Sequence, residues 1–127
     1  MERTPVNPAT VPEAAGGYVN GLQVSGFARL LFISGQIPQT PAGDVPADFE
    51  KQCRLAWSNV VAVLTGAGMG VENLVKVTTF LSDRDHASAN TLVRQEFLGG
   101  HEPALTVVVT GIWDPTWFIE IEAVAAA

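Results

Sequence analysis

The chain has 127 residues, of which 47% are hydrophobic and 16% are charged, and its net charge is −6. This length suits a single domain over residues 1–127, and the composition excludes a disordered chain. Seven basic residues against thirteen acidic ones leave no basic stripe, so we expect no nucleic-acid partner. No apolar run approaches the roughly 20 residues of a membrane-spanning helix, and the N-terminus is too polar for a signal peptide. We therefore expect a cytoplasmic protein with no membrane partner.

The predicted elements start with an irregular N-terminal arm over residues 1–12, which is interrupted by three prolines. A short extended segment over 18–24 follows. The apolar run LLFIS at 30–34 predicts a strand, and the proline-rich segment 37–46 predicts a loop.

Asp48 is a candidate N-cap for the first helix, because apolar residues follow it at three- and four-residue spacing. This stripe consists of Cys53, Ala56, Trp57, Val60, Leu64 and Ala67. The glycines at 66, 68 and 70 follow a helix and precede a strand, which indicates a helix terminus and not a dinucleotide-binding loop. The remaining predicted elements are a strand over 75–81, a helix over 86–98 and strands over 105–110 and 117–124.

The order β-β-α-β-α-β-β predicts an α+β sandwich with two helices on one face of a mixed sheet. Val107, Val108 and Val109 are consecutive strand residues, so this strand is apolar on both faces. Two helices cover only one face of the sheet. We therefore expect the chain to self-associate through the other face.

Metal and disulfide chemistry find little support in the sequence. Cys53 is the lone cysteine, so it forms no internal disulfide and no cysteine-based zinc cluster. His86 and His101 lack the spacing of a metal site, and Asp83 and Asp85 stand where helix capping explains them. We expect no bound metal.

Glu120 and Glu122 are the first candidates for chemistry. In a strand they share one face, about 7 Å apart. A solvated strand face would explain them, but Phe118 and Val124 lie on the same face and make it half-buried. A carboxylate beside apolar walls suits proton transfer.

Three aromatic residues are further candidates. Tyr18, the only tyrosine, either packs on the core or lines a site. Trp113 and Trp117 flank the turn before the last strand, where they could pack, form an interface or form a pocket wall.

Seven short motifs follow one another along nearly the whole chain. They are GYVNG at 17–21, SGQIP at 34–38, GDVPAD at 43–48, NV at 59–60, VKVT at 75–78, PA at 103–104 and IEIEA at 119–123. Together they resemble the RidA/YjgF family of reactive-intermediate deaminases.

The resemblance implies a chorismate-mutase-like fold that assembles as a homotrimer, with ligand clefts between neighbouring subunits. It also implies hydrolysis of enamines and imines, such as 2-aminoacrylate, to 2-keto acids and ammonia without a metal or organic cofactor. In this family an arginine binds the substrate carboxylate bidentately. A glutamate in the last strand positions or activates the attacking water.

Carried over residue by residue, the resemblance makes Tyr18 the pocket tyrosine and Glu120 the last-strand glutamate, and these two are the expected catalytic residues. Ser34 and Gly35 match the pair that lines the cleft. Asn90 matches an asparagine of the second helix.

The chain departs from the family at the arginine. Where the deaminases read Pro-Ala-Arg-Ser, Leu105 and Thr106 follow Pro-Ala. Losing a charge-assisted bidentate contact costs on the order of 2–5 kcal/mol. Arg29 and Arg94 have no assigned partner and could supply the missing charge.

We therefore expect a small-molecule enzyme that acts on a less charged, more apolar carbonyl, enamine or imine compound. Leu105, Thr106 and Trp113 would line its substrate pocket. The alternative is a non-catalytic trimer that binds a metabolite or regulates a partner.

Overall fold

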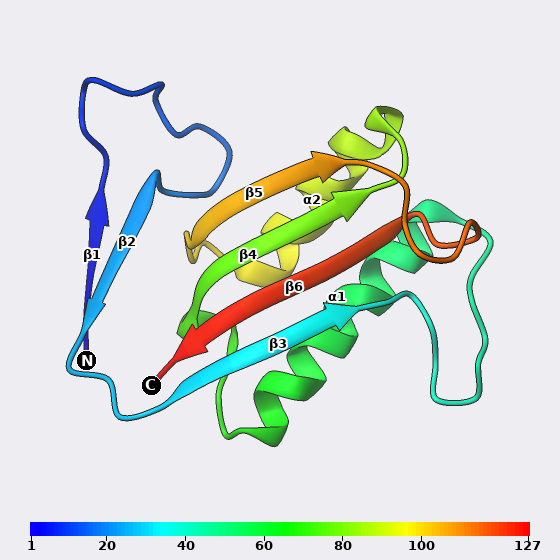
Figure 1. Ribbon diagram of the computed structural model, residues 1–127, viewed down its shortest axis with the longest axis horizontal. Helices are drawn as coiled ribbons and strands as arrows, with labels where there is room; N and C mark the ends of the chain where they lie inside the picture. The colour runs from blue at the N-terminus through cyan, green and yellow to red at the C-terminus, as the bar shows by residue number, and fades with distance from the viewer.

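The computed structural model describes all 127 residues. In chain order the elements are β1 (Glu2–Val6), β2 (Gly21–Ser25), β3 (Leu30–Gln36), α1 (Phe49–Gly66), η1 (Val71–Asn73), β4 (Leu74–Leu81), η2 (Arg84–His86), α2 (Ala87–Leu98), β5 (Ala104–Val109) and β6 (Ile119–Ala126), where η marks a single 3-10 turn. The main sheet has the strand order β3-β6-β4-β5, in which only β4 and β5 run parallel. Figure 1 shows both α-helices on one side of this sheet. The predicted α+β fold, with two helices on one face of a mixed sheet, is confirmed.

The N-terminal arm contains a strand, so the prediction of irregular structure over residues 1–12 is wrong in its first half. Glu2–Val6 pairs antiparallel with β2, and Pro5 lies opposite Leu22. Proline has no N–H for a ladder, which restricts it to edge strands, and β1 is one edge of a two-stranded ribbon. In Figure 1 this ribbon stands apart from the main sheet.

Helix α1 begins and ends as its sequence indicates. The Asp48 carboxylate accepts a hydrogen bond from the Lys51 backbone N–H at 3.1 Å, as expected of an N-cap. Every member of the predicted stripe except Ala67 is fully buried. Ala67 is the C-cap, and Gly68 follows it with φ +70°, a conformation that glycine adopts without strain. The glycine cluster is therefore a helix terminus.

Several boundaries differ from the prediction by one or two residues, and two of these differences have identifiable reasons. The second helix starts after a 3-10 turn, in which the Asp83 carboxylate accepts a hydrogen bond from the Asp85 backbone N–H at 2.7 Å. The last strand starts two residues late, at Ile119. The Phe118 N–H donates to the side chain of Gln52 at 2.8 Å instead of to a neighbouring strand.

Side-chain alternation separates the two faces of the sheet. Ile119 and Ile121 are fully buried against the helices, whereas Glu120 and Glu122 point to the other side. We call that uncovered side the open face. It carries Leu30, Phe32 and Ser34 of β3, Lys76, Thr78 and Phe80 of β4, Thr106 and Val108 of β5, and Glu120, Glu122 and Val124 of β6.

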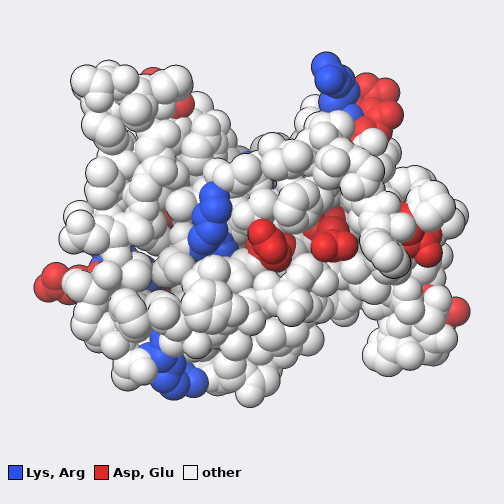
Figure 2. Space-filling view, in the orientation of Figure 1, with Lys and Arg blue, Asp and Glu red and all other residues white.

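The open face displays apolar side chains to the surroundings. Phe32 is 74% exposed, and Val107, Val108 and Val109 are all exposed, so both sides of β5 lack cover. In Figure 2 this face is mostly uncharged, with a few charged groups in a row across its middle.

Neither helix combines the length and the apolar composition needed to cross a membrane.

Candidate functional site

A bulge in β3 places Gly35 against the carboxylate of Glu120. The ladder between β3 and β6 shifts register between Ile33 and Gln36, so β3 carries one extra residue there. A β-carbon built on Gly35 would overlap a carboxylate oxygen of Glu120 and lie 2.8 Å from its Cδ. Only glycine leaves room for this carboxylate. The structure thus brings these two predicted site residues together.

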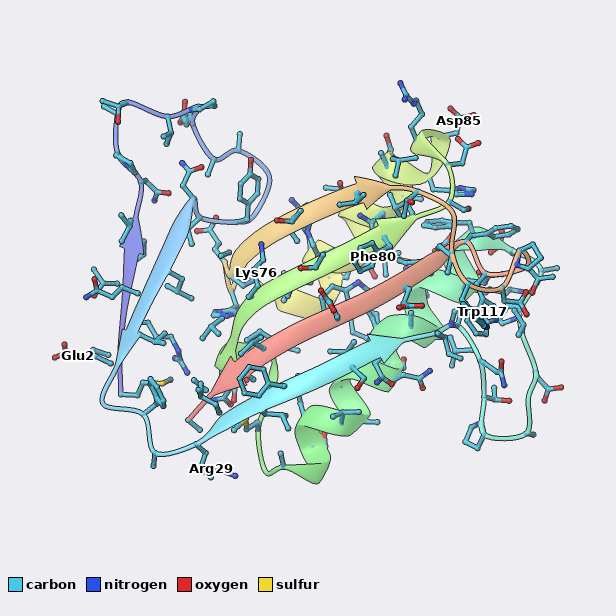
Figure 3. The ribbon with its side chains drawn as sticks, viewed as in Figure 1. Glu2, Arg29, Lys76, Phe80, Asp85 and Trp117 are labelled. Atoms are coloured by element: carbon cyan, nitrogen blue, oxygen red, sulfur yellow. The ribbon has the colours of Figure 1, made fainter.

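Glu120 lies in an open cavity of about 550 Å³ beyond the carboxyl ends of β4 and β5. We call it the Glu120 cavity, and its lining residues are Phe80, Thr110, Gly111, Ile112, Trp113 and Glu120. Trp113 is 92% exposed, so its ring is available to a ligand or to another copy of the chain. Figure 3 shows Phe80 near the end of β4 from which this cavity opens. The sequence had pointed to Trp113 and Glu120 but not to Phe80 or Ile112.

Glu120 is the only charged residue of this lining. The two ion pairs of the chain lie elsewhere, since both join Arg54 of α1 to the carboxylates of Glu50 and Glu96. Glu120 thus stands in a partly apolar cavity whose lining holds no basic side chain, a position that suits a general acid-base group.

Gln52 hydrogen-bonds to the turn that precedes β6, and the sequence analysis did not identify this residue. Its side chain is 1% exposed. Its Nε2 donates to the carbonyl oxygens of Pro46 at 2.8 Å and Thr116 at 2.9 Å, and its Oε1 accepts from the Phe118 N–H at 2.8 Å. These three bonds fix the start of β6 relative to α1. The sequence feature that could have identified Gln52 is a glutamine at a buried position of an amphipathic helix.

Asp114 stabilises the same turn through hydrogen bonds to Thr116. Its Oδ1 accepts from the Thr116 backbone N–H at 2.8 Å and from the Thr116 hydroxyl at 2.6 Å. These bonds lower the pKa of Asp114 because they favour the ionised form. Gln52 and Asp114 together therefore hold the part of the β5–β6 segment that follows Trp113.

Tyr18 lies at the opposite end of β5 from the Glu120 cavity. The N–H of Val19 donates to the Pro103 carbonyl at 3.2 Å, and Val19 bridges to Ala104. Glu120 is level with Val108, because both pair with the same residue of β4. Four residues of strand separate the two positions, or about 13 Å.

Leu105 and Thr106 point to opposite faces of the sheet. Leu105 pairs with Val77 and packs against the buried core on the helix side. Thr106 lies on the open face, where its hydroxyl accepts a hydrogen bond from the Lys76 Nζ at 2.6 Å. Within one copy, Leu105 and Glu120 are therefore on different sides of the sheet.

Ser34 lines a second, smaller cavity of about 250 Å³ on the open face. Lys76 and Glu122 lie in the same lining, together with apolar side chains. Figure 3 shows Lys76 toward the start of β4, away from Phe80. Glu122 and Glu120 thus line different cavities, although they are neighbours on one strand.

Asn90 and Arg94 are buried in the helix layer. Asn90 is fully buried, with its Oδ1 3.9 Å from the Cys53 Sγ. Arg94 is 3% exposed, its Nη2 donates to the Gly16 carbonyl at 2.8 Å, and burial lowers its pKa. Arg29 donates to a backbone carbonyl at the end of α1. Neither arginine lines the Glu120 cavity.

The two histidines have packing roles. The ring of His86 stacks on Phe49 with centroids 4.1 Å apart. The His101 Nε2 donates to the Leu74 carbonyl at 2.6 Å. No three side chains of His, Cys, Asp and Glu converge in the structure.

Comparisons with known proteins cover nearly the whole chain. The family model described as Endoribonuclease L-PSP matches residues 8–127. The 2-iminobutanoate/2-iminopropanoate deaminase of Escherichia coli is 35% identical over 118 residues, which is 90% of each chain. The mitochondrial protein mmf2 of Schizosaccharomyces pombe is 36% identical over 99% of each chain.

Two crystal structures are similar over their full length. A protein of unknown function from the Rid family of Yersinia pestis, YyfB, has a TM-score of 0.86 at 26% identity and covers 100% of each chain. Escherichia coli TdcF, crystallised with bound serine, has a TM-score of 0.73 at 32% identity and covers 98% of each chain. The sequence match and the shared fold agree, and the chain belongs to the RidA/YjgF family.

Proposed function

We propose that this protein hydrolyses imines and enamines in the manner of a deaminase, acting on an apolar carbonyl-type substrate with Glu120 as its acid-base group. The observation that carries the proposal is the carboxylate of Glu120, held against Gly35 in an open cavity with apolar walls. The relative named 2-iminobutanoate/2-iminopropanoate deaminase supports the reaction class.

The reaction needs one group that both takes and returns a proton. Glu120 accepts a proton from water while the water oxygen bonds to the carbon of the protonated C=N group, whose π electrons move to nitrogen, and the product is a neutral carbinolamine. The protonated Glu120 then returns that proton to nitrogen. The C–N bond breaks as the hydroxyl proton passes through the Glu120 carboxylate to the departing ammonia, and the products are a carbonyl compound and ammonium. An enamine enters the same path after protonation on carbon.

The placement of the site residues supports a cleft that is completed by a second copy of the chain. Tyr18 and Leu105 lie at the start of β5, whereas Glu120 and Trp113 lie beyond its other end. One copy therefore cannot bring both groups to one small molecule. In a homotrimer Tyr18 of one subunit would orient the water or the carbinolamine beside Glu120 of the next. The uncovered apolar side chains of the open face support such an assembly.

Leu105 sets the chemical character of that cleft. It stands where the family's motif has the arginine that binds a substrate carboxylate, and it offers hydrocarbon only. Together with Trp113 of the next copy it would give the cleft apolar walls. Gly35 lies against Glu120, whereas Ser34 lines the second cavity and Thr106 is bonded to Lys76, so these two would form a polar edge farther from Glu120. Asn90 would act on a ligand only through its neighbours, because it is buried.

The Glu120→Gln variant tests the catalytic role. Glutamine keeps the shape beside Gly35 but cannot take the proton, so we expect the rate of imine hydrolysis to fall by roughly 10²- to 10⁴-fold. The melting temperature and the oligomer size should stay those of the parent. Turnover that is unchanged in the folded variant would remove Glu120 from the mechanism.

Sedimentation at micromolar concentration tests the assembly. We expect a trimer, and we expect Phe32→Asp to dissociate it, because Phe32 is the most exposed apolar side chain of the open face. A monomeric parent protein would contradict the shared cleft.

The replacement of arginine by Leu105 also favours a second candidate, a non-catalytic trimer that binds a metabolite or regulates a partner. The two candidates differ in a thermal-shift screen followed by a turnover assay. Ligands that raise the melting temperature and are never converted would favour the binding protein.

A further inference from the structure

The charges around the Glu120 cavity limit what it binds. Its lining holds one carboxylate and no basic side chain. On the open face the only basic residue is Lys76, which is bonded to Thr106. Lys76 lies four residues before Phe80 on the same strand, so about 13 Å separates their backbones. Within one copy the cavity therefore holds one acidic and no basic side chain, and Tyr18 and Leu105, which are proposed to come from the next copy, bring no basic group to it.

The walls of the cavity include two aromatic side chains. The apolar half of the lining consists of the aromatic side chains of Trp113 and Phe80 and the aliphatic side chain of Ile112. Aromatic faces attract cations, and indole does so most strongly. A volume of about 550 Å³ is in the range of pockets that hold small organic ligands.

We infer that the Glu120 cavity takes protonated imines that carry an aromatic or branched apolar substituent and no carboxylate, with Trp113 as the specificity-determining residue. This inference rests on the hydrolytic function proposed above and narrows its substrate class. The protonated C=N group is a cation, so it is attracted by both Glu120 and the indole ring. The apolar substituent packs against Phe80 and Ile112.

A 2-imino acid fits this cavity poorly. Its carboxylate is bonded to the imine carbon, so it would lie within about 5 Å of Glu120 with no cation to offset the like charge. At an effective dielectric constant between about 20 and 40, this repulsion corresponds to roughly 15- to 300-fold in affinity. We expect the selectivity for carboxylate-free imines to be of that order.

The substrate class implies the preceding reaction. A primary amine that loses two electrons and two protons to an amine oxidase becomes a protonated imine: R–CH2–NH3+ gives R–CH=NH2+. Hydrolysis of that ion by one water gives the aldehyde R–CHO and NH4+. The reaction that supplies the substrate would thus be amine oxidation and not amino-acid oxidation.

The experiment compares two imines that differ only in the carboxylate. A flavin amine oxidase generates the imine of 2-phenylethylamine, and an amino-acid oxidase generates the 2-imino acid of phenylalanine. Semicarbazide reacts quickly with free imine and more slowly with the carbonyl product to give the same semicarbazone, so added protein lowers the initial rate of semicarbazone formation. We expect the carboxylate-free imine to be preferred at least tenfold in kcat/KM.

Variants of two tryptophans separate specificity from fold. Trp113→Leu should raise KM for the imine of 2-phenylethylamine about 3- to 30-fold with little change in kcat, and Trp113→Phe should fall between it and the parent. Trp117→Phe is the matched control, because Trp117 lies outside the cavity lining. It should behave as the parent does.

Direct binding gives a readout that does not need turnover. Benzyltrimethylammonium is a stable cation of similar shape, and calorimetry should detect its binding to the parent and a loss of at least fivefold in Glu120→Gln. Phenylacetate should not bind. Equal or faster hydrolysis of the 2-imino acid would overturn the inference and leave Glu120 hydrolysis standing, and it would indicate a cation supplied by a neighbouring copy. Hydrolysis of neither imine would overturn both proposals.

Discussion

Replacing Gly35 by alanine should displace the Glu120 carboxylate and leave the fold intact. The new β-carbon would overlap a carboxylate oxygen and lie 2.8 Å from Cδ, whereas ordinary contact begins at 3.4 Å. The Cδ atom must therefore move by at least about 0.6 Å, and the oxygen must move farther. A misplacement of about 1 Å in a reacting group costs on the order of 100-fold in rate. We expect kcat/KM for imine hydrolysis to fall tenfold to a hundredfold.

The stability of this variant should change little. Gly35 has no positive φ, so alanine fits its backbone. Alanine at a compatible position gains about 0.4–1 kcal/mol by restricting the unfolded chain. A side chain pushed off its rotamer, as Glu120 would be, loses about 0.5–1.5 kcal/mol. These two terms offset each other, so the free energy of unfolding should stay within about 1 kcal/mol of the parent value.

Gly111→Ala is the matched control, because Gly111 lines the same cavity and a β-carbon there meets nothing within 4 Å. Turnover of 2-phenylethylamine imine is measured for both variants beside thermal melting. The control should keep the activity that Gly35→Ala loses. If Gly35→Ala is folded and fully active, the observed position of Glu120 is not the one used in catalysis.

Three further predictions concern stability. Gln52→Leu leaves the Pro46 and Thr116 carbonyls and the Phe118 N–H without partners. Urea unfolding should therefore show that the free energy of unfolding falls by about 2–4 kcal/mol. A fall below about 1 kcal/mol would mean that water replaces these bonds. Burial raises the pKa of Cys53 from 9.0 to about 12. The unfolded chain therefore loses its thiol proton at lower pH than the folded chain, and the free energy of unfolding should fall by up to about 1.4 kcal/mol per pH unit between pH 9 and pH 12. Parallel pH profiles for the parent and Cys53→Ala would contradict this. Asp48→Ala should cost about 1 kcal/mol and Asp48→Asn much less, since asparagine also caps; equal losses would exclude the capping role.

The helix layer was predictable because its signals are local. Asp48, the apolar stripe of α1 and the glycines after it lie within about six turns of chain, and each is read from spacing alone. The strand at Glu2–Val6 was not predictable in this way. Its partner is β2, some twenty residues away, and Pro5 argues against any strand except one at an edge.

The site depends on register, which spacing along one strand does not give. Glu120 could be placed on a strand face from the alternation in IEIEA, but the bulge that seats it against Gly35 exists only in the pairing of β3 with β6. Leu105 matches the family's arginine position by motif, yet its pairing with Val77 turns it to the helix side. The motifs therefore predict Tyr18, Leu105 and Glu120 as site residues, and the sheet decides which of them lie close together within one copy. The proposed cleft takes Tyr18 and Glu120 from different copies and so requires assembly. A variant that only dissociates the oligomer should therefore lose turnover as completely as Glu120→Gln while it keeps the Glu120 cavity.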